Sequence, residues 1–137
     1  MKFFAILILP KDTNASDARL VEHTASVLMR PFKMWEDDVP AENGFWDYYW
    51  CCTKEWMEER RIDHAAYPST ASRQAPIVFP VAQVPLAGMT DSIITPNGEW
   101  HRSKGSYAEE DPSWAPEALN ICRSFAGHFA VLLYCHG

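Results

Sequence analysis

Cysteine and histidine have the widest range of chemistry in this chain, which holds four cysteines and five histidines. Zinc sites usually show close pairs such as C-x-x-C or H-x-x-x-H, and the sequence contains neither. Cys51 and Cys52 are adjacent, so on a strand their thiols would point to opposite faces. Together with Cys122 and Cys135 they are predicted to be free and mostly buried thiols. No metal site is predicted.

Nucleophilic catalysis needs a cysteine or serine beside a base, and no motif of the sequence brings such residues together. The chain lacks G-x-S-x-G, the phosphate-binding glycine loop and the dinucleotide-binding loop, so no cofactor is predicted. One enzymatic interpretation stays open. His101 and Glu99 follow a turn at Asn97 and Gly98, and they could form a ligand site or a small active site with a cysteine.

Aromatic residues are concentrated in residues 45–52. Alternation along a strand would place Trp46, Tyr48 and Trp50 on one face. Trp56 follows as the apolar anchor of a short charged helix. These rings either pack on helices as the inner face of a sheet, or stay exposed and contact a partner, because aromatic side chains supply contact area at low entropic cost.

Acidic residues are concentrated in the same part of the chain. Residues 36–63 hold nine acidic and three basic residues, a local charge equal to the −6 of the whole chain. This acidic stretch is either a face that only keeps the protein soluble or a binding surface. A binding surface of this charge disfavours direct nucleic-acid binding and favours a protein partner with a basic surface. The acidic residues predicted to contact that partner are Glu36, Asp37, Asp38, Glu55, Glu58 and Glu59.

Hydrophobic patterning predicts the elements that must position these residues. Two continuous apolar runs, one near each end of the chain, are typical of strands covered on both faces. Predicted strands are residues 3–9, 45–52, 77–79, 91–95, 99–101 and 129–135. Predicted helices are residues 17–28, 54–63 and 113–126. Asn14 or Ser16 caps the first helix and Pro31 follows it, whereas Ser113 caps the last helix and Gly127 follows it.

The order of these elements indicates an α+β fold and one domain over residues 1–137. It fits a ferredoxin-like split β-α-β sandwich, which has an antiparallel sheet with two helices on one face. In that arrangement the two apolar end strands are neighbours. A long insertion, residues 53–90, follows the second strand.

The beginning of the chain has no features of a signal peptide. No run approaches the roughly 18 apolar residues of a membrane helix, and free thiols fit a reducing compartment. We therefore expect a cytoplasmic protein that makes no membrane contact.

Three short motifs resemble an uncharacterised family of small proteins from bacteriophages and bacterial mobile elements. They are the aromatic strand at residues 45–50, the T-P-N-G-E-W-H turn at residues 95–101 and the terminal Cys135-His136-Gly137. The family pattern has a W-D-W or W-D-Y strand, a Gly-Gly-Arg-Trp element, the same turn and a terminal Asp-Cys-His. This chain departs from it at residues 51–54, where the glycines are missing, and at Tyr134, which replaces the aspartate.

The resemblance implies a phage or mobile-element setting but no activity. In that setting small acidic proteins frequently bind and block host machinery. Combined with the acidic and aromatic residues, it leads to a functional hypothesis. The protein would be an accessory protein that blocks a host protein, for example an anti-CRISPR-like inhibitor of a nucleic-acid-dependent defence complex.

Overall fold

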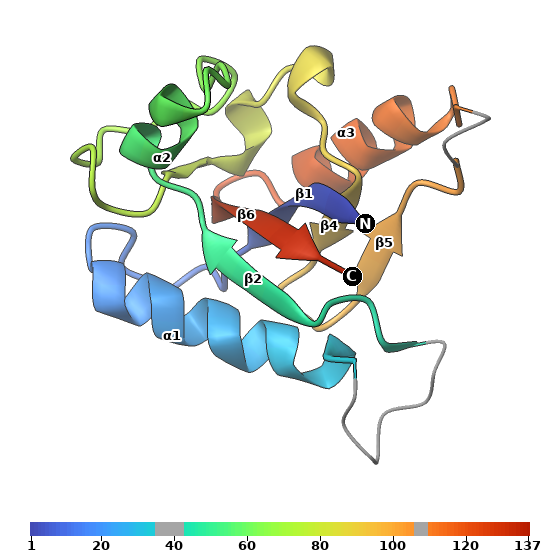
Figure 1. Cartoon of the computed structure of the whole chain (residues 1–137), viewed down its shortest axis with the longest axis horizontal. Helices are drawn as coiled ribbons and strands as arrows, with labels where there is room; N and C mark the ends of the chain where they lie inside the picture. Colours follow the sequence, from blue (N-terminus) through green and yellow to red (C-terminus); the bar gives the residue numbers. More distant parts are fainter. Residues whose placement is uncertain (35–42, 106–109) are drawn as a thin grey trace.

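A computed structural model describes residues 1–34, 43–105 and 110–137. The strands are β1 (Lys2–Ile8), β2 (Tyr48–Cys51), β3 (Val78–Pro80), β4 (Ser92–Ile94), β5 (Trp100–Arg102) and β6 (Phe129–His136) (Figure 1). The helices are α1 (Ala18–Met29), α2 (Lys54–Glu59) and α3 (Trp114–Ser124), with single 3₁₀ turns at Arg30–Phe32, Val81–Gln83 and Leu86–Gly88. Every predicted strand and helix has a counterpart here, although β2 and α2 are shorter than expected.

The described strands form one six-stranded sheet in the order β2-β6-β1-β4-β5, and β3 also pairs with β6. The two apolar end strands are neighbours, as predicted, and β1 and β6 run antiparallel with Phe3 opposite Cys135. However, β1 and β4 are parallel, with Ile6 opposite Ile93. The sheet is therefore mixed, and the expectation of a purely antiparallel, ferredoxin-like sheet is not met.

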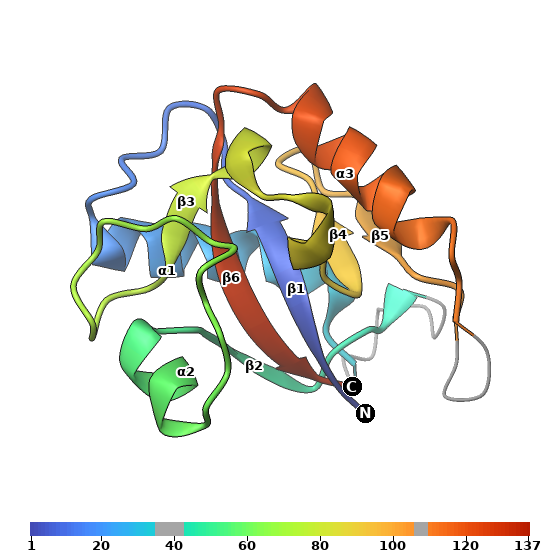
Figure 2. The same cartoon turned by 90° about the horizontal axis from the view of Figure 1, so that it is seen from above.

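The two long helices lie on opposite faces of the sheet, whereas the sequence predicted both on one face (Figures 1 and 2). Val21 and Ala25 of α1 pack in the same cluster as Leu7. Ala118 of α3 packs in a second cluster with Ile6. Alternate residues of β1 thus belong to different cores, which explains why this strand is apolar from Phe3 onwards.

The handedness of strand crossovers accounts for this arrangement. The connection from β1 to β2 and the connection from β5 to β6 each join parallel strands, and both cross the sheet towards the β2 edge. The strands β1 and β5 point in opposite directions, so two right-handed crossovers place α1 and α3 on opposite faces. In a ferredoxin-like fold the two crossovers run in opposite directions across the sheet, and both helices then share one face.

One edge of the sheet is made in two pieces. β2 pairs with the last residues of β6, and β3 pairs with its first residues. Between them the chain leaves the sheet through α2 and returns where Ile77 N donates to Cys52 O at 2.9 Å. The predicted long insertion after the second strand is therefore an excursion from this edge, and it places α2 beside β2.

Candidate functional site

Aromatic side chains gather on the α3 side of the sheet, at the end where α3 no longer covers it. Figure 2 shows this end of β1 and β6 lying between α2 and α3. The strand register places alternate residues of β1, β2 and β6 side by side here, and α2 adds one more ring. We call this group the aromatic surface; its members are Phe4, Tyr48, Trp50, Trp56, Tyr134 and His136.

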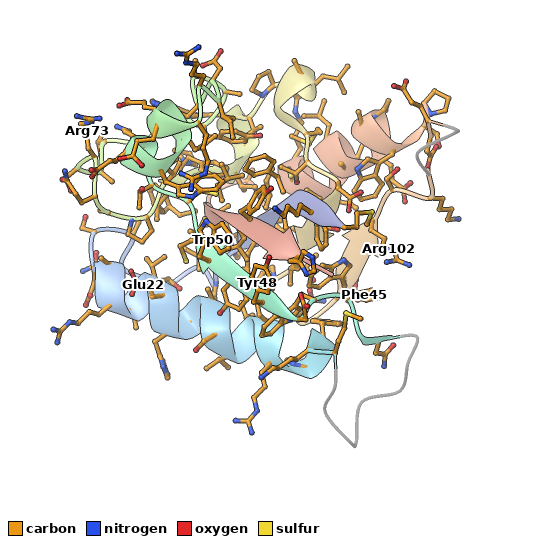
Figure 3. The ribbon with its side chains drawn as sticks, viewed as in Figure 1. Glu22, Phe45, Tyr48, Trp50, Arg73 and Arg102 are labelled. Atoms are coloured by element: carbon orange, nitrogen blue, oxygen red, sulfur yellow. The ribbon has the colours of Figure 1, made fainter. Side chains whose placement is uncertain are left out.

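The rings of the aromatic surface are ordered by contact with one another. Tyr48 stacks on His136 with ring centres 4.7 Å apart and on Trp50 at 5.9 Å. Trp50 in turn contacts Tyr134 at 5.1 Å and Trp56 at 5.5 Å. Tyr48 nevertheless remains 44% exposed. The surface is thus a rigid aromatic array with an accessible end (Figure 3).

Asp47 positions the accessible end of this array. Its Oδ1 accepts hydrogen bonds from His136 Nδ1 at 2.7 Å and from Tyr48 N at 2.9 Å. Asp47 N also donates to His136 O, so Asp47 and Tyr48 both lie opposite His136, as in a β-bulge. The hydrogen bond from His136 is the main cause that lowers the pKa of the Asp47 carboxyl. Asp47 is therefore ionised at neutral pH and fixes the ring of His136 and the backbone of Tyr48.

Trp46 does not belong to the aromatic surface, which corrects the predicted row of Trp46, Tyr48 and Trp50. The backbone bends at Asp47, so the alternation of faces breaks there. Trp46 lies on the α1 side, where it meets Tyr49 edge to face at 4.8 Å and donates from Nε1 to Met29 O at 2.8 Å. It is a core residue that joins the end of α1 to the strand.

Helix α2 positions Trp56 in the aromatic surface. The Thr53 hydroxyl caps this helix by accepting from Trp56 N at 3.1 Å. The indole packs on Tyr134 at 5.0 Å, and the Arg60 guanidinium lies 4.4 Å from its ring centre. The fully buried residue of the helix is Met57. It was not among the predicted core residues, although its position next to a half-buried tryptophan could have indicated it.

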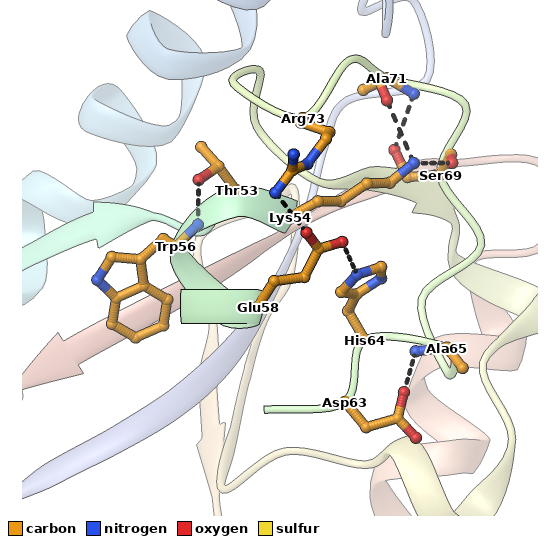
Figure 4. A network of polar contacts seen from close by, with 10 residues as sticks. All are labelled: Thr53, Lys54, Trp56, Glu58, Asp63, His64, Ala65, Ser69, Ala71 and Arg73. Carbon is orange, nitrogen blue, oxygen red and sulfur yellow. Dashed lines mark hydrogen bonds and ion pairs between the residues drawn. The ribbon is translucent and has the colours of Figure 1, made fainter. Parts of the chain in front are cut away.

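Several of the predicted acidic contact residues are engaged within the molecule. Glu58 accepts from Arg73 at 2.6 Å and from His64 at 3.1 Å, and the hydrogen bond from His64 is the main cause that lowers its pKa (Figure 4). Glu59 lies 3.9 Å from Arg60. Glu55 is half-buried on α2. Glu36, Asp37 and Asp38 lie outside the described residues, so the structure does not place them.

The alternative site at His101 is not joined by a cysteine. His101 Nε2 of β5 lies 3.1 Å from Oε2 of Glu99, the residue just before this strand. Burial raises the pKa of Cys51 to about 12 and that of Cys122 to about 11. Burial also raises the pKa values of the remaining two thiols, those of Cys52 and Cys135. The four thiols are therefore protonated at neutral pH, which leaves them poor nucleophiles.

A groove of about 1100 Å³ adjoins the aromatic surface and shares Phe4 with it. Phe45 and Trp100 also line it, and Arg102 lies 4.6 Å from the ring centre of Phe45 (Figure 3). Charged groups of both signs surround it, including Lys2 and Arg102 as well as two aspartates. The groove shows no preference for one sign of charge.

Within the described residues, no three histidine, cysteine or acidic side chains lie close enough to hold a metal ion. None of the described helices combines the length and the apolar character needed to cross a membrane. No family model, curated protein or solved structure matches the chain.

Proposed function

We propose that this protein is a binding domain that holds a partner protein against the aromatic surface. The observation that carries the proposal is Tyr48, which is 44% exposed although it is fixed between His136 and Trp50. Rings that are already ordered lose little entropy on binding, and tyrosine and tryptophan are the residues that most often dominate interface energy.

The nature of the partner follows from the charge of the chain. The net charge of −6 and the acidic residues 36–63 support a partner with a basic surface. The resemblance to phage and mobile-element proteins narrows the proposal to a host protein, which this protein would block. An inhibitor of a nucleic-acid-dependent defence complex fits both features, because a phosphate-binding surface is basic.

Affinity capture from bacterial lysate tests this proposal when it is combined with matched variants. Wild-type protein and Val27→Ala should retain the same partner, because Val27 is exposed on α1, on the opposite side of the sheet. Tyr48→Ala should lose it, whereas Tyr48→Phe, which keeps the ring, should retain it. A partner that binds Tyr48→Ala as well as wild type would contradict the proposal.

A further inference from the structure

The outer side of β2 is an open sheet edge. β2 is the terminal strand of the sheet order, and α1 runs alongside it on one face of the sheet (Figure 1). Residues 32–34 pair with Phe45 and Trp46 just before β2, so the open part of the edge is β2 itself. Cys52 N donates inwards to Leu132 O, so the alternation of an antiparallel ladder turns the backbone groups of Tyr49 and Cys51 outwards. Within the described residues no hydrogen bond reaches those outward groups.

The side chains of this edge strand do not include the charged residues or proline that often prevent strand pairing. Natural edge strands often carry proline or charged residues, especially lysine, that discourage the approach of another strand. The four residues of β2 are two tyrosines, a tryptophan and a cysteine. The opposite edge strand, β5, contains Arg102 and is followed by Lys104, in keeping with the usual protection. β2 therefore differs from β5, the other terminal strand, in having no charged residue.

We infer that an extended, basic segment of the partner adds to the sheet along the outer edge of β2. This inference rests on the proposed function, because the added strand would lie directly beside the aromatic surface. Alternate side chains of the segment would point to the α3 side and contact Tyr48 and Trp50. The remaining side chains would point to the α1 side.

Glu22 gives the α1 side its preference for a basic segment. It is exposed on α1, and its charge contributes to the raised pKa of Cys51, which places it near the end of β2 (Figure 3). No ion pair within the described residues involves Glu22. A lysine or arginine of the added strand would therefore meet an unpaired carboxylate on this side.

A second copy of the chain fits this edge less well than a basic segment does. Antiparallel pairing of β2 with its own copy would place two molecules of net charge −6 side by side. The two-fold axis would also bring both Glu22 side chains to the same face of the joined sheet. Like charges oppose that contact and favour a basic strand.

A random octapeptide display library is the probe that tests this inference. Peptides enriched on wild-type protein should carry lysine or arginine at alternate positions. Cys51→Pro removes the outward N–H and fixes φ at this position, whereas Cys51→Ala keeps the N–H and also removes the thiol. We expect Cys51→Pro to weaken peptide binding about fivefold to tenfold and Cys51→Ala to leave it unchanged. Glu22→Lys should weaken it as well.

Amide hydrogen exchange provides a readout that does not depend on the proline variant folding. The amides of Tyr49 and Cys51 should exchange readily in the free protein and become protected when an enriched peptide binds. Failure to enrich any peptide, or binding without protection of these amides, would overturn the inference. If enriched peptides bind normally to Cys51→Pro but not to Tyr48→Ala, strand addition is wrong while the proposed function stands. The proposed function itself is wrong if Tyr48→Ala still captures the partner from lysate, and this result is independent of the peptide experiment.

Discussion

Two tryptophans of the same segment show how strongly a single backbone bend controls the role of a residue. Trp46 Nε1 donates to the carbonyl of Met29 in the α1 core. Trp50 Nε1 is also buried, but no hydrogen-bond acceptor reaches it in the described residues. A buried donor without a partner lowers stability, whereas a paired one does not. The two indoles are therefore expected to respond differently to the same substitution.

Trp46→Phe should lower the free energy of unfolding by about 1–3 kcal/mol, because it also leaves the Met29 carbonyl without its partner. Trp50→Phe removes an unpaired N–H and should have a smaller effect. Urea denaturation of both variants measures the difference. A larger loss of stability in Trp50→Phe would show that the two hydrogen-bonding environments are assigned wrongly.

Asp47 gives a pH-dependent prediction at the same scale. Its pKa is lowered in the folded protein from an ordinary value of 3.8, mainly by the hydrogen bond from His136. The stabilising contribution of the carboxylate is therefore complete above about pH 5 and is lost as the pH falls through the lowered pKa. Asp47→Asn should be less stable than wild type at neutral pH, and the difference should vanish in acid. A difference that persists at low pH in urea denaturation would argue against this role.

At the scale of elements, the sequence predicts the pieces better than their arrangement. Continuous apolar runs identify β1 and β6 and their burial on both faces, because each face meets a separate core. The order of elements along the chain does not reveal the direction in which each crossover travels. For that reason the mixed sheet and the opposite placement of α1 and α3 were missed.

The same limit applies to the candidate site. Alternation within one strand identifies Tyr48 and Trp50 as neighbours on a face. It cannot show that Tyr134 and His136 join them, because this depends on the register between β2 and β6. Nor can it show that Glu58 pairs with Arg73, which lies across the insertion. Contacts between distant parts of the chain require the fold.

Helix α2 is short, so its cap should matter for the position of Trp56. Thr53→Ala removes the hydroxyl that accepts from Trp56 N, which typically costs about 1 kcal/mol. Amides of α2 should then exchange about fivefold faster, while Thr53→Ser should exchange like wild type. Equal exchange rates in wild type and Thr53→Ala would mean that packing of Trp56 and Met57 alone holds the helix.

At the scale of the whole molecule, both cores are built on the same central strands. Ile6 of β1 belongs to the core under α3, and Leu7 belongs to the core under α1. Neither core can be lost without exposing a face of β1. We therefore expect one cooperative unfolding transition, with coincident far-ultraviolet and near-ultraviolet circular dichroism curves. Two separated transitions would indicate that the faces unfold independently.

We place the proposed function at the end of the sheet where residues of β2 and β6 form the aromatic surface, beside the outer edge of β2. One exposed residue of α1, Val27, serves as the internal reference. Val27 is exposed there and can be truncated without disturbing either core.

The most direct test is the dissociation constant of the captured partner, measured by calorimetry with wild type, Tyr48→Ala and Val27→Ala. Tyr48→Ala should weaken binding about tenfold or more, as expected for an aromatic residue at the centre of an interface. Val27→Ala should bind like wild type. Equal affinity of Tyr48→Ala and wild type, with both proteins folded, would contradict the central claim that the aromatic surface is the binding site.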